Sequence, residues 1–209
     1  MAVNQPSEYC PQFGGAATTL PIPPDIVPER NLLAAEWGVL SFLLSEVAFF
    51  ATLIVAYVAF KGRDVVGPSA EVLSLPLALG TTACLVASSF TIHLATHALG
   101  HGARAMFRWW WLASIALGVA FLTGTAFEWY GLIVHEGLTI SRNLFGTTFF
   151  TLVGFHALHV TGGVVAMLLV LVALGRQIGQ ENALAPRMVS WYWHFVDVVW
   201  IVVFVVVYL

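Results

Sequence analysis

The chain has 209 residues, of which 59% are hydrophobic and only 9% are charged, and its mean hydropathy is +0.88. A soluble domain of this length carries about a quarter charged residues, and a folded globule still needs a polar surface, so the apolar excess is expected to face lipid. The formal net charge is −3 without a basic patch, which argues against a nucleic-acid partner. Cys10 and Cys84 form neither a metal cluster nor a convincing disulfide pair.

The N-terminal segment, residues 1–36, is rich in proline and polar residues. Such a composition disfavours regular packing, so the segment is predicted to be an extended arm. It lacks a basic region followed by an apolar run, so it is not predicted to be a cleaved signal peptide.

Five long apolar stretches fill residues 37–209, at about 37–60, 74–98, 109–133, 144–175 and 188–209. Each is long enough to cross about 30 Å of hydrocarbon as a helix that rises ~1.5 Å per residue. The sequence therefore predicts an all-α integral membrane bundle of five transmembrane helices. No internal repeat is visible, which weakens the interpretation as a small transporter built from inverted repeats.

Basic residues in the connections predict the orientation, because cytoplasmic loops carry an excess of Lys and Arg. With five spans, the N-terminus shares one side with the second and fourth connections. That side holds Arg30, Arg104, Arg108, Arg176 and Arg187, and the other side holds Lys61, Arg63 and Arg142. We therefore expect a cytoplasmic N-terminus and a C-terminus outside.

Among the acidic and imidazole side chains inside the apolar stretches, we single out six as candidates, because a charge there costs about 2.5–3.5 kcal/mol on insertion scales and is normally turned toward a protein partner. They are Glu46, Glu128, His156, His159, His194 and Asp197. Counting residues from the span ends places Glu46, Asp197 and the two central histidines at a similar depth near the membrane midplane. We expect these side chains to face one another or another protein.

The histidines allow two interpretations each. His194 and Asp197 are three residues apart, so they share a helix face and are able to hydrogen-bond. They could form a proton relay or a structural pair that fixes the last helix, and we favour the structural pair. His156 and His159 are also three apart. Imidazole binds metals and haem, but no further ligands are spaced to complete a metal site, so we favour hydrogen bonds between helices.

Glu46 has only Phe and Leu side chains one turn away on its own helix. A carboxyl without a partner in such surroundings is expected to keep its proton. It either donates one structural hydrogen bond or lines a proton route or a lipid pocket. Glu128 follows a row of small residues that ends at Gly124, so it is expected to make a structural hydrogen bond on a packed helix face. His93 and His97 lie near the second connection and are predicted to be interfacial.

Three stretches resemble the cytochrome c oxidase subunit III family. Residues 191–200 read Trp-Tyr-Trp-His-Phe-Val-Asp-Val-Val-Trp, which is similar to the final helix of that family. Residues 154–160 read Gly-Phe-His-Ala-Leu-His-Val, and residues 45–50 read Ser-Glu-Val-Ala-Phe-Phe, which resembles the family's buried-carboxylate motif. The resemblance runs from about residue 30 to the C-terminus.

The resemblance implies a short bacterial form that lacks the first two of seven helices. Such a subunit packs against subunit I, which holds the haems and the copper, and it carries no redox centre itself. It is expected to bind phospholipid in a cleft and to support subunit I stability, proton uptake and oxygen access. Glu46 matches the family's buried carboxylate, and Arg176 resembles a basic position that holds a lipid phosphate.

The resemblance therefore predicts a cofactor-free accessory subunit of a proton-pumping haem–copper terminal oxidase in the bacterial cytoplasmic membrane, in a complex with subunits I and II. Two alternatives within the fold are a quinol oxidase subunit and a homologue that accompanies nitric oxide reductase. The Ser-Glu-Val form of the first motif favours the cytochrome c type. An alternative of another class is a b-type haem protein with His156 and His194 as axial ligands.

Overall fold

The computed structural model describes the chain apart from residues 1–25, 64–71 and 175–182, and side chains from residue 34 onward. The described part is all-helical and confirms the predicted fold class, since its five helices are each long and apolar enough to cross a membrane. In chain order these are α1 (Ile26–Phe60), α2 (Leu75–Gly100), α3 (Arg104–Val134), α4 (Leu144–Leu174) and α5 (Leu184–Tyr208).

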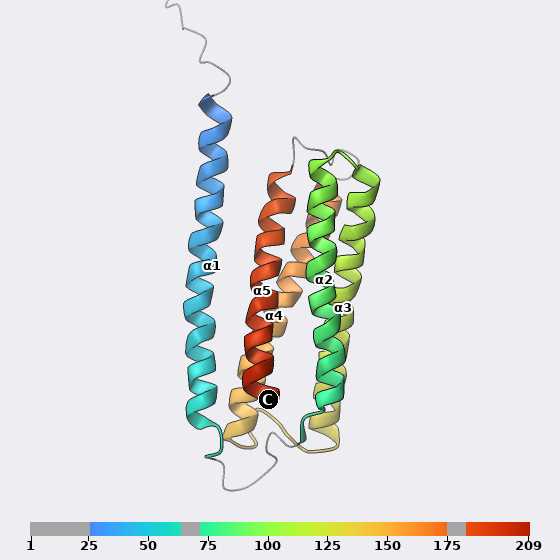
Figure 1. The fold of residues 1–209 in the computed structure, drawn as a ribbon. Helices are drawn as coiled ribbons and strands as arrows, with labels where there is room; N and C mark the ends of the chain where they lie inside the picture. Colours follow the sequence, from blue (N-terminus) through green and yellow to red (C-terminus); the bar gives the residue numbers. More distant parts are fainter. Residues whose placement is uncertain (1–25, 64–71, 175–182) are drawn as a thin grey trace, which may run out of the picture.

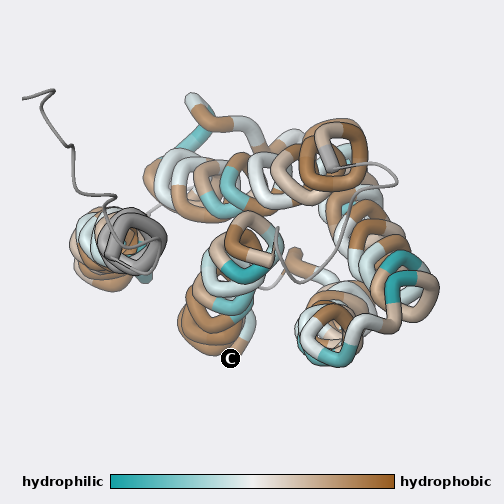
Figure 2. Tube along the Cα trace, turned by 90° about the horizontal axis from the view of Figure 1, so that it is seen from above, coloured by the Kyte–Doolittle hydropathy of each residue, from teal (hydrophilic) through white to brown (hydrophobic). Residues whose placement is uncertain are grey.

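The helices run up and down, and α4 and α5 separate α1 from the α2–α3 pair (Figure 1). Helix α1 packs against α4 and α5, whereas α2 packs against α3 and α5 and α3 also packs against α4. Seen end-on, hydrophobic residues predominate along the helices (Figure 2). The α2–α3 turn lies at the upper end of the bundle in Figure 1, and C-terminal Leu209 lies at the lower end.

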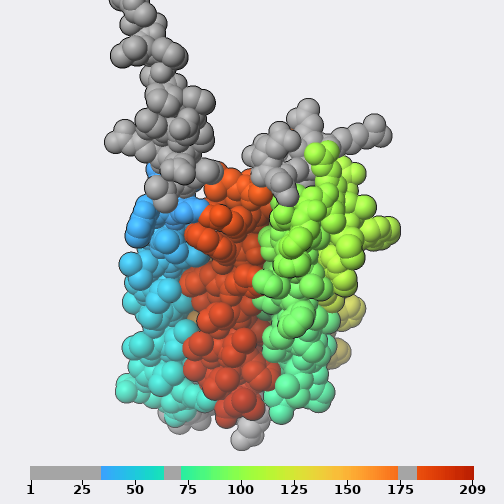
Figure 3. Space-filling view, turned by 45° about the horizontal axis from the view of Figure 1, so that its top comes forward, coloured from blue at the N-terminus to red at the C-terminus, as the bar shows by residue number. Residues whose placement is uncertain are grey.

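Helix α1 is the most separate of the five helices, and polar contacts join it to α5 at both ends. Near the upper end, Glu36 of α1 forms an ion pair with Arg187 of α5. Near the lower end, the Lys61 ammonium, just after α1, donates a hydrogen bond to the Val206 carbonyl oxygen of α5 at 2.9 Å. In the space-filling view, α5 fills the face between α1 and α2 (Figure 3).

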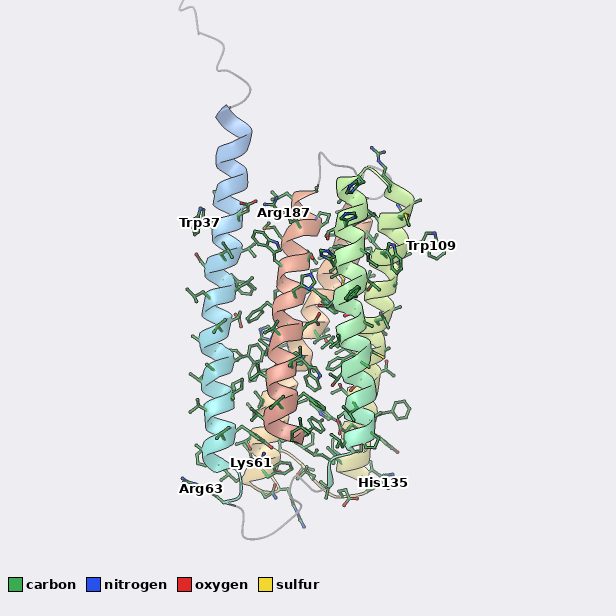
Figure 4. All side chains as sticks on the ribbon, viewed as in Figure 1. Trp37, Lys61, Arg63, Trp109, His135 and Arg187 are labelled. Atoms are coloured by element: carbon green, nitrogen blue, oxygen red, sulfur yellow. The ribbon has the colours of Figure 1, made fainter. Side chains whose placement is uncertain are left out.

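Large apolar side chains cover the outside of the bundle, as lipid contact requires. Trp37 and Trp109 are 67% and 76% exposed. They stand near the upper end with Arg187, and Lys61 and Arg63 stand at the lower end (Figure 4). Aromatic and basic side chains favour the two membrane–water interfaces, so these residues mark the two edges of the apolar band.

Three helices begin earlier than the sequence predicted: α1 at Ile26, α3 at Arg104 and α5 at Leu184. Helix α1 begins at Ile26, so residues 26–36, which were predicted to be extended, are helical and the predicted arm is too long. Pro28 is the third residue of α1, and Pro186 is the third residue of α5. Proline is tolerated there because the amides of a first helical turn have no partner within the helix. Because of its proline-rich composition, the start of α1 was therefore predicted too late in the chain.

Buried tryptophans join the helices around them. The indole N–H of Trp193 on α5 donates to Ser88 Oγ of α2 at 2.9 Å, and that of Trp200 donates to Thr82 Oγ1 at 2.9 Å. The Trp193 ring lies against two glycines, where an added Cβ would come within 2.8 Å of it at Gly118 and 2.6 Å at Gly163. These glycines let α3 and α4 approach α5 closely.

The variant Gly163→Ala should therefore lower the free energy of unfolding by about 1–3 kcal/mol, because the new methyl group overpacks the Trp193 ring. Thermal unfolding of the purified chain in detergent measures this. Gly80→Ala is the control, because a Cβ there meets nothing within 4 Å. Equal unfolding temperatures for the two variants would contradict the packing argument.

Candidate functional site

Glu46 on α1 meets His159 on α4. The Glu46 Oε2 atom lies 3.0 Å from His159 Nε2, and the two side chains are only 18% and 15% exposed. The hydrogen-bond partner of Glu46 thus lies on another helix, since the side chains one turn away on its own helix are apolar. The contact also places these two residues at one depth, which agrees with the depth estimated from the sequence.

The hydrogen bonds around His159 define what the pair is able to do. Its Nδ1 atom lies 2.7 Å from the Phe155 carbonyl oxygen and must donate, because a carbonyl only accepts. The Nε2 atom therefore either accepts a proton from the Glu46 carboxyl or, as imidazolium, donates one to the carboxylate. The two groups share one mobile proton, and moving it requires no rotation of either side chain.

Helix α5 and two phenylalanine rings complete the surroundings of the pair. The Tyr192 hydroxyl of α5 donates to the His159 carbonyl oxygen at 2.9 Å. The rings of Phe49 and Phe50 lie with their centroids 6.1 and 4.9 Å from the His159 ring. An acid–imidazole pair is thus held where α1, α4 and α5 meet, in largely apolar surroundings.

His194 and Asp197 form a second polar cluster with Ser89 of α2. Ser89 Oγ donates to Asp197 Oδ2 and lies 2.8 Å from His194 Nδ1. Because the serine proton is used for the carboxylate, the imidazole Nδ1–H is the donor to Ser89. Their spacing allows His194 and Asp197 to hydrogen-bond directly, and the structure joins them through Ser89. Asp197 is 4% exposed, and its Oδ1 atom has no hydrogen-bond partner among the described residues.

His156 is fully buried, and neither ring nitrogen has a hydrogen-bond partner in the described part of the chain. Its ring lies 4.8 Å from the Trp200 ring and about 6 Å from those of Phe50 and Phe121, between centroids (6.2 and 5.9 Å). Interhelical hydrogen bonds were expected for both central histidines, and of the two only His159 makes them. The two rings come from one helix face, but the His159 ring meets a carboxyl and the His156 ring meets aromatic rings.

Glu128 on α3 accepts a hydrogen bond from the Tyr208 hydroxyl of α5 at 2.7 Å. Glu128 is 8% exposed and lies near the lower end of the bundle, since α3 ends at Val134. This bond joins α3 to α5.

Ser89, Tyr192 and Tyr208 take part in these clusters but were not singled out from the sequence. Hydroxyl side chains are common in transmembrane helices, so their sequence signal is weak. The one available signal was spacing, because Ser89 precedes His93 by four residues. Arg176, the predicted lipid-phosphate ligand, lies outside the described residues. Among those described, no three His, Cys, Asp or Glu side chains gather as a metal site.

The fold and these clusters define a class of protein, an integral membrane helix bundle with protonatable pairs enclosed between its helices. The family model of cytochrome c oxidase subunit III matches residues 32–209. The chain belongs to the cytochrome c oxidase subunit III family, as the sequence motifs predicted.

Relatives support the assignment over most of the chain. Cytochrome c oxidase subunit 3 of Corynebacterium diphtheriae is 38% identical, over 82% of this chain and 85% of the relative. The protein of the same name from Synechocystis is 35% identical, over 83% of this chain and 74% of the relative. Cytochrome bo(3) ubiquinol oxidase subunit 3 of Pseudomonas aeruginosa is 37% identical, over 83% of each.

A double-mutant cycle on Glu46→Gln and His159→Phe tests the shared proton bond. We expect a coupling free energy of about 0.5–3 kcal/mol, because residues in direct contact do not act additively. Thermal unfolding of the four proteins in detergent measures it. The matched control pairs Ser45→Ala with His159→Phe, since the Ser45 hydroxyl donates within its own helix, to the Phe42 carbonyl oxygen. Additive effects of the first pair would show that the contact contributes no stability.

Proposed function

We propose that this chain is the accessory, cofactor-free subunit III of a proton-pumping haem–copper terminal oxidase. The family match over residues 32–209 is the observation on which the proposal rests. The five-helix membrane fold supports it, as does the acid–imidazole pair held between α1 and α4. The haems and copper belong to partner subunits, with subunit I in direct contact and subunit II in the same complex.

The electron donor is the finer part of the proposal. We propose cytochrome c, with quinol as the alternative. The relatives named for the two donors are almost equally similar, at 38% and 37% identity. The donor is proposed to bind to other subunits, which accounts for the similarity of this chain to relatives named for both donors. The Ser-Glu-Val motif at Glu46 supports the cytochrome c type.

The Glu46–His159 pair is proposed to support proton supply to subunit I or to line the lipid pocket. An apolar groove beside it supports the lipid role. The groove lies between α1 and α5, has a volume of about 250 Å³, and is lined by Val47, Phe50, Ala51, Ile54, Phe195, Val198, Val199 and Val202. Such a groove suits an acyl chain, and Arg176 is proposed to hold the phosphate of a bound phospholipid.

The chain is proposed to lie in the bacterial cytoplasmic membrane with its N-terminus in the cytoplasm. Described basic residues at the upper end of the bundle include Arg104, Arg108 and Arg187, and those at the lower end are Lys61, Arg63 and Arg142. Arg30 and Arg176 add to the upper side by sequence, which gives the excess that cytoplasmic segments carry.

The alternative of another class, a b-type haem protein, gains no support from the histidine geometry. His156 is enclosed by aromatic rings, and His194 Nδ1 contacts Ser89 on α2. Axial ligation would need one nitrogen of each ring directed at the same iron.

Affinity purification from the native membrane tests the proposed function. The chain should co-purify with a haem–copper subunit I, and the complex should consume oxygen. The separated chain should give a featureless reduced-minus-oxidised spectrum, because the haems are carried by its partners. A haem band in the separated chain would instead establish the b-type haem alternative.

The variant Glu46→Gln in the assembled oxidase tests the role of the pair. Glutamine keeps the shape of the side chain but is unable to exchange a proton with His159. We expect a lower ratio of pumped protons to electrons, with a smaller loss of oxygen consumption. Ser45→Ala is the matched control. Unchanged pumping and turnover in Glu46→Gln would leave the pair with a structural role only.

A further inference from the structure

Helix α2 carries a row of histidines that the proposed function does not use. His93 and His97 of α2 and His101 just after it are four residues apart, and all three are exposed. Residues at this spacing lie one above another on the same helix face. We call these three residues the histidine row. Half-buried Ser89 continues the same spacing one turn deeper.

The upper part of the row is in direct contact. The ring centroids of His97 and His101 are 4.4 Å apart, with the planes inclined by 34°. His101 Nδ1 lies 2.9 Å from the His97 carbonyl oxygen and donates to it. His101 belongs to the turn between α2 and α3 at the upper end of the bundle, where the chain meets water.

The lower part of the row leads into the bundle. His93 is close enough to His194 of α5 to interact with it electrostatically. His194 and Asp197 both contact Ser89, and the Asp197 Oδ1 atom has no partner within the described chain. The twelve residues from Ser89 to His101 span about 18 Å at ~1.5 Å per residue. The row therefore connects a surface turn with a buried carboxyl near the membrane midplane.

We propose that the histidine row is a path for proton exchange between the aqueous phase at the upper end of the bundle and the buried carboxyl of Asp197. Each imidazole accepts a proton on one ring nitrogen and releases one from the other, so the row moves charge without any oxidation or reduction. The row has a rise of about 6 Å between successive residues, a separation that one bridging water spans. The path ends where the Ser89 hydroxyl and His194 transfer the proton to Asp197.

The other ionisable side chains near α5 belong to separate contacts. On α1, Glu36 pairs with Arg187 and Glu46 pairs with His159. On α4, His159 is bonded to Glu46, and His156 lies against the Trp200 ring. Of the imidazoles in the described part of the chain, those of the histidine row on α2 thus connect an aqueous surface with the Asp197 cluster. The inference concerns this chain alone and does not depend on the proposed oxidase function.

Time-resolved infrared spectroscopy of the chain in lipid nanodiscs tests the path. The sequence holds three aspartates, Asp25, Asp64 and Asp197. A parent protein with Asp25→Asn and Asp64→Asn, labelled with ¹³C-carboxyl aspartate, therefore reports on Asp197 without altering it. A jump from about pH 9 to about pH 5 brackets the usual range of buried carboxyls and imidazoles. The rate at which the labelled carboxylic acid band appears is the measurement.

We expect His93→Gln in the parent protein to slow protonation of Asp197 roughly tenfold or more, because glutamine does not relay protons. The final amplitude should be unchanged. His135→Gln is the control, since His135 is an exposed histidine at the opposite end of the bundle. Circular dichroism checks that each variant keeps its helices.

Two results would overturn the proposal. One is an equal rate in the parent protein and His93→Gln, which would leave the row as a polar face that another subunit covers. The other is a labelled Asp197 band that does not respond to the pH jump in the parent protein. Because no oxidase partner is present, neither result depends on whether the chain assembles with subunit I.

Discussion

The need to pair polar side chains inside hydrocarbon governs this structure. Four acidic side chains are described within its helices, and each contacts a residue of another helix. The pairs are Glu36 with Arg187, Glu46 with His159, Glu128 with Tyr208 and Asp197 with Ser89. Water is absent from the membrane core, so a carboxyl without such a partner would carry most of its desolvation cost.

These pairs also decide which helices lie together. Apolar side chains gain little by leaving lipid for another apolar surface, so close packing and hydrogen bonds must orient the helices. Helix α5 is the centre of this network, because it is bonded to α1 through Arg187, to α2 through Trp193 and Trp200, and to α3 through Tyr208. Helix α5 carries the most specific family motif. It thus also makes the most polar contacts to neighbouring helices in the described part of the chain.

The arrangement separates two protonatable sites that the sequence places at one depth. Glu46 and His159 lie on the α1 and α4 side of α5, whereas Asp197 and His194 turn toward Ser89 on α2. Large aromatic rings, including that of Trp200 against His156, occupy the interior nearby. The Glu46–His159 site therefore lies beside the apolar groove at α1. The Asp197–His194 site lies beside the histidine row on α2.

The sequence by itself determined the membrane class, the number of spans and the family, because span length and motif are local properties of the chain. It also located the residues that needed partners, since Glu46 and Asp197 stand out against apolar neighbours. It placed the start of α1 too late, because proline was taken as a mark of extended chain. Only the tertiary structure decided that Glu46 meets His159, that Ser89 bridges His194 and Asp197, and that the His156 ring has no hydrogen-bond partner among the described residues. These pairings depend on how each helix is rotated against its neighbours, and that rotation is fixed by packing between distant segments.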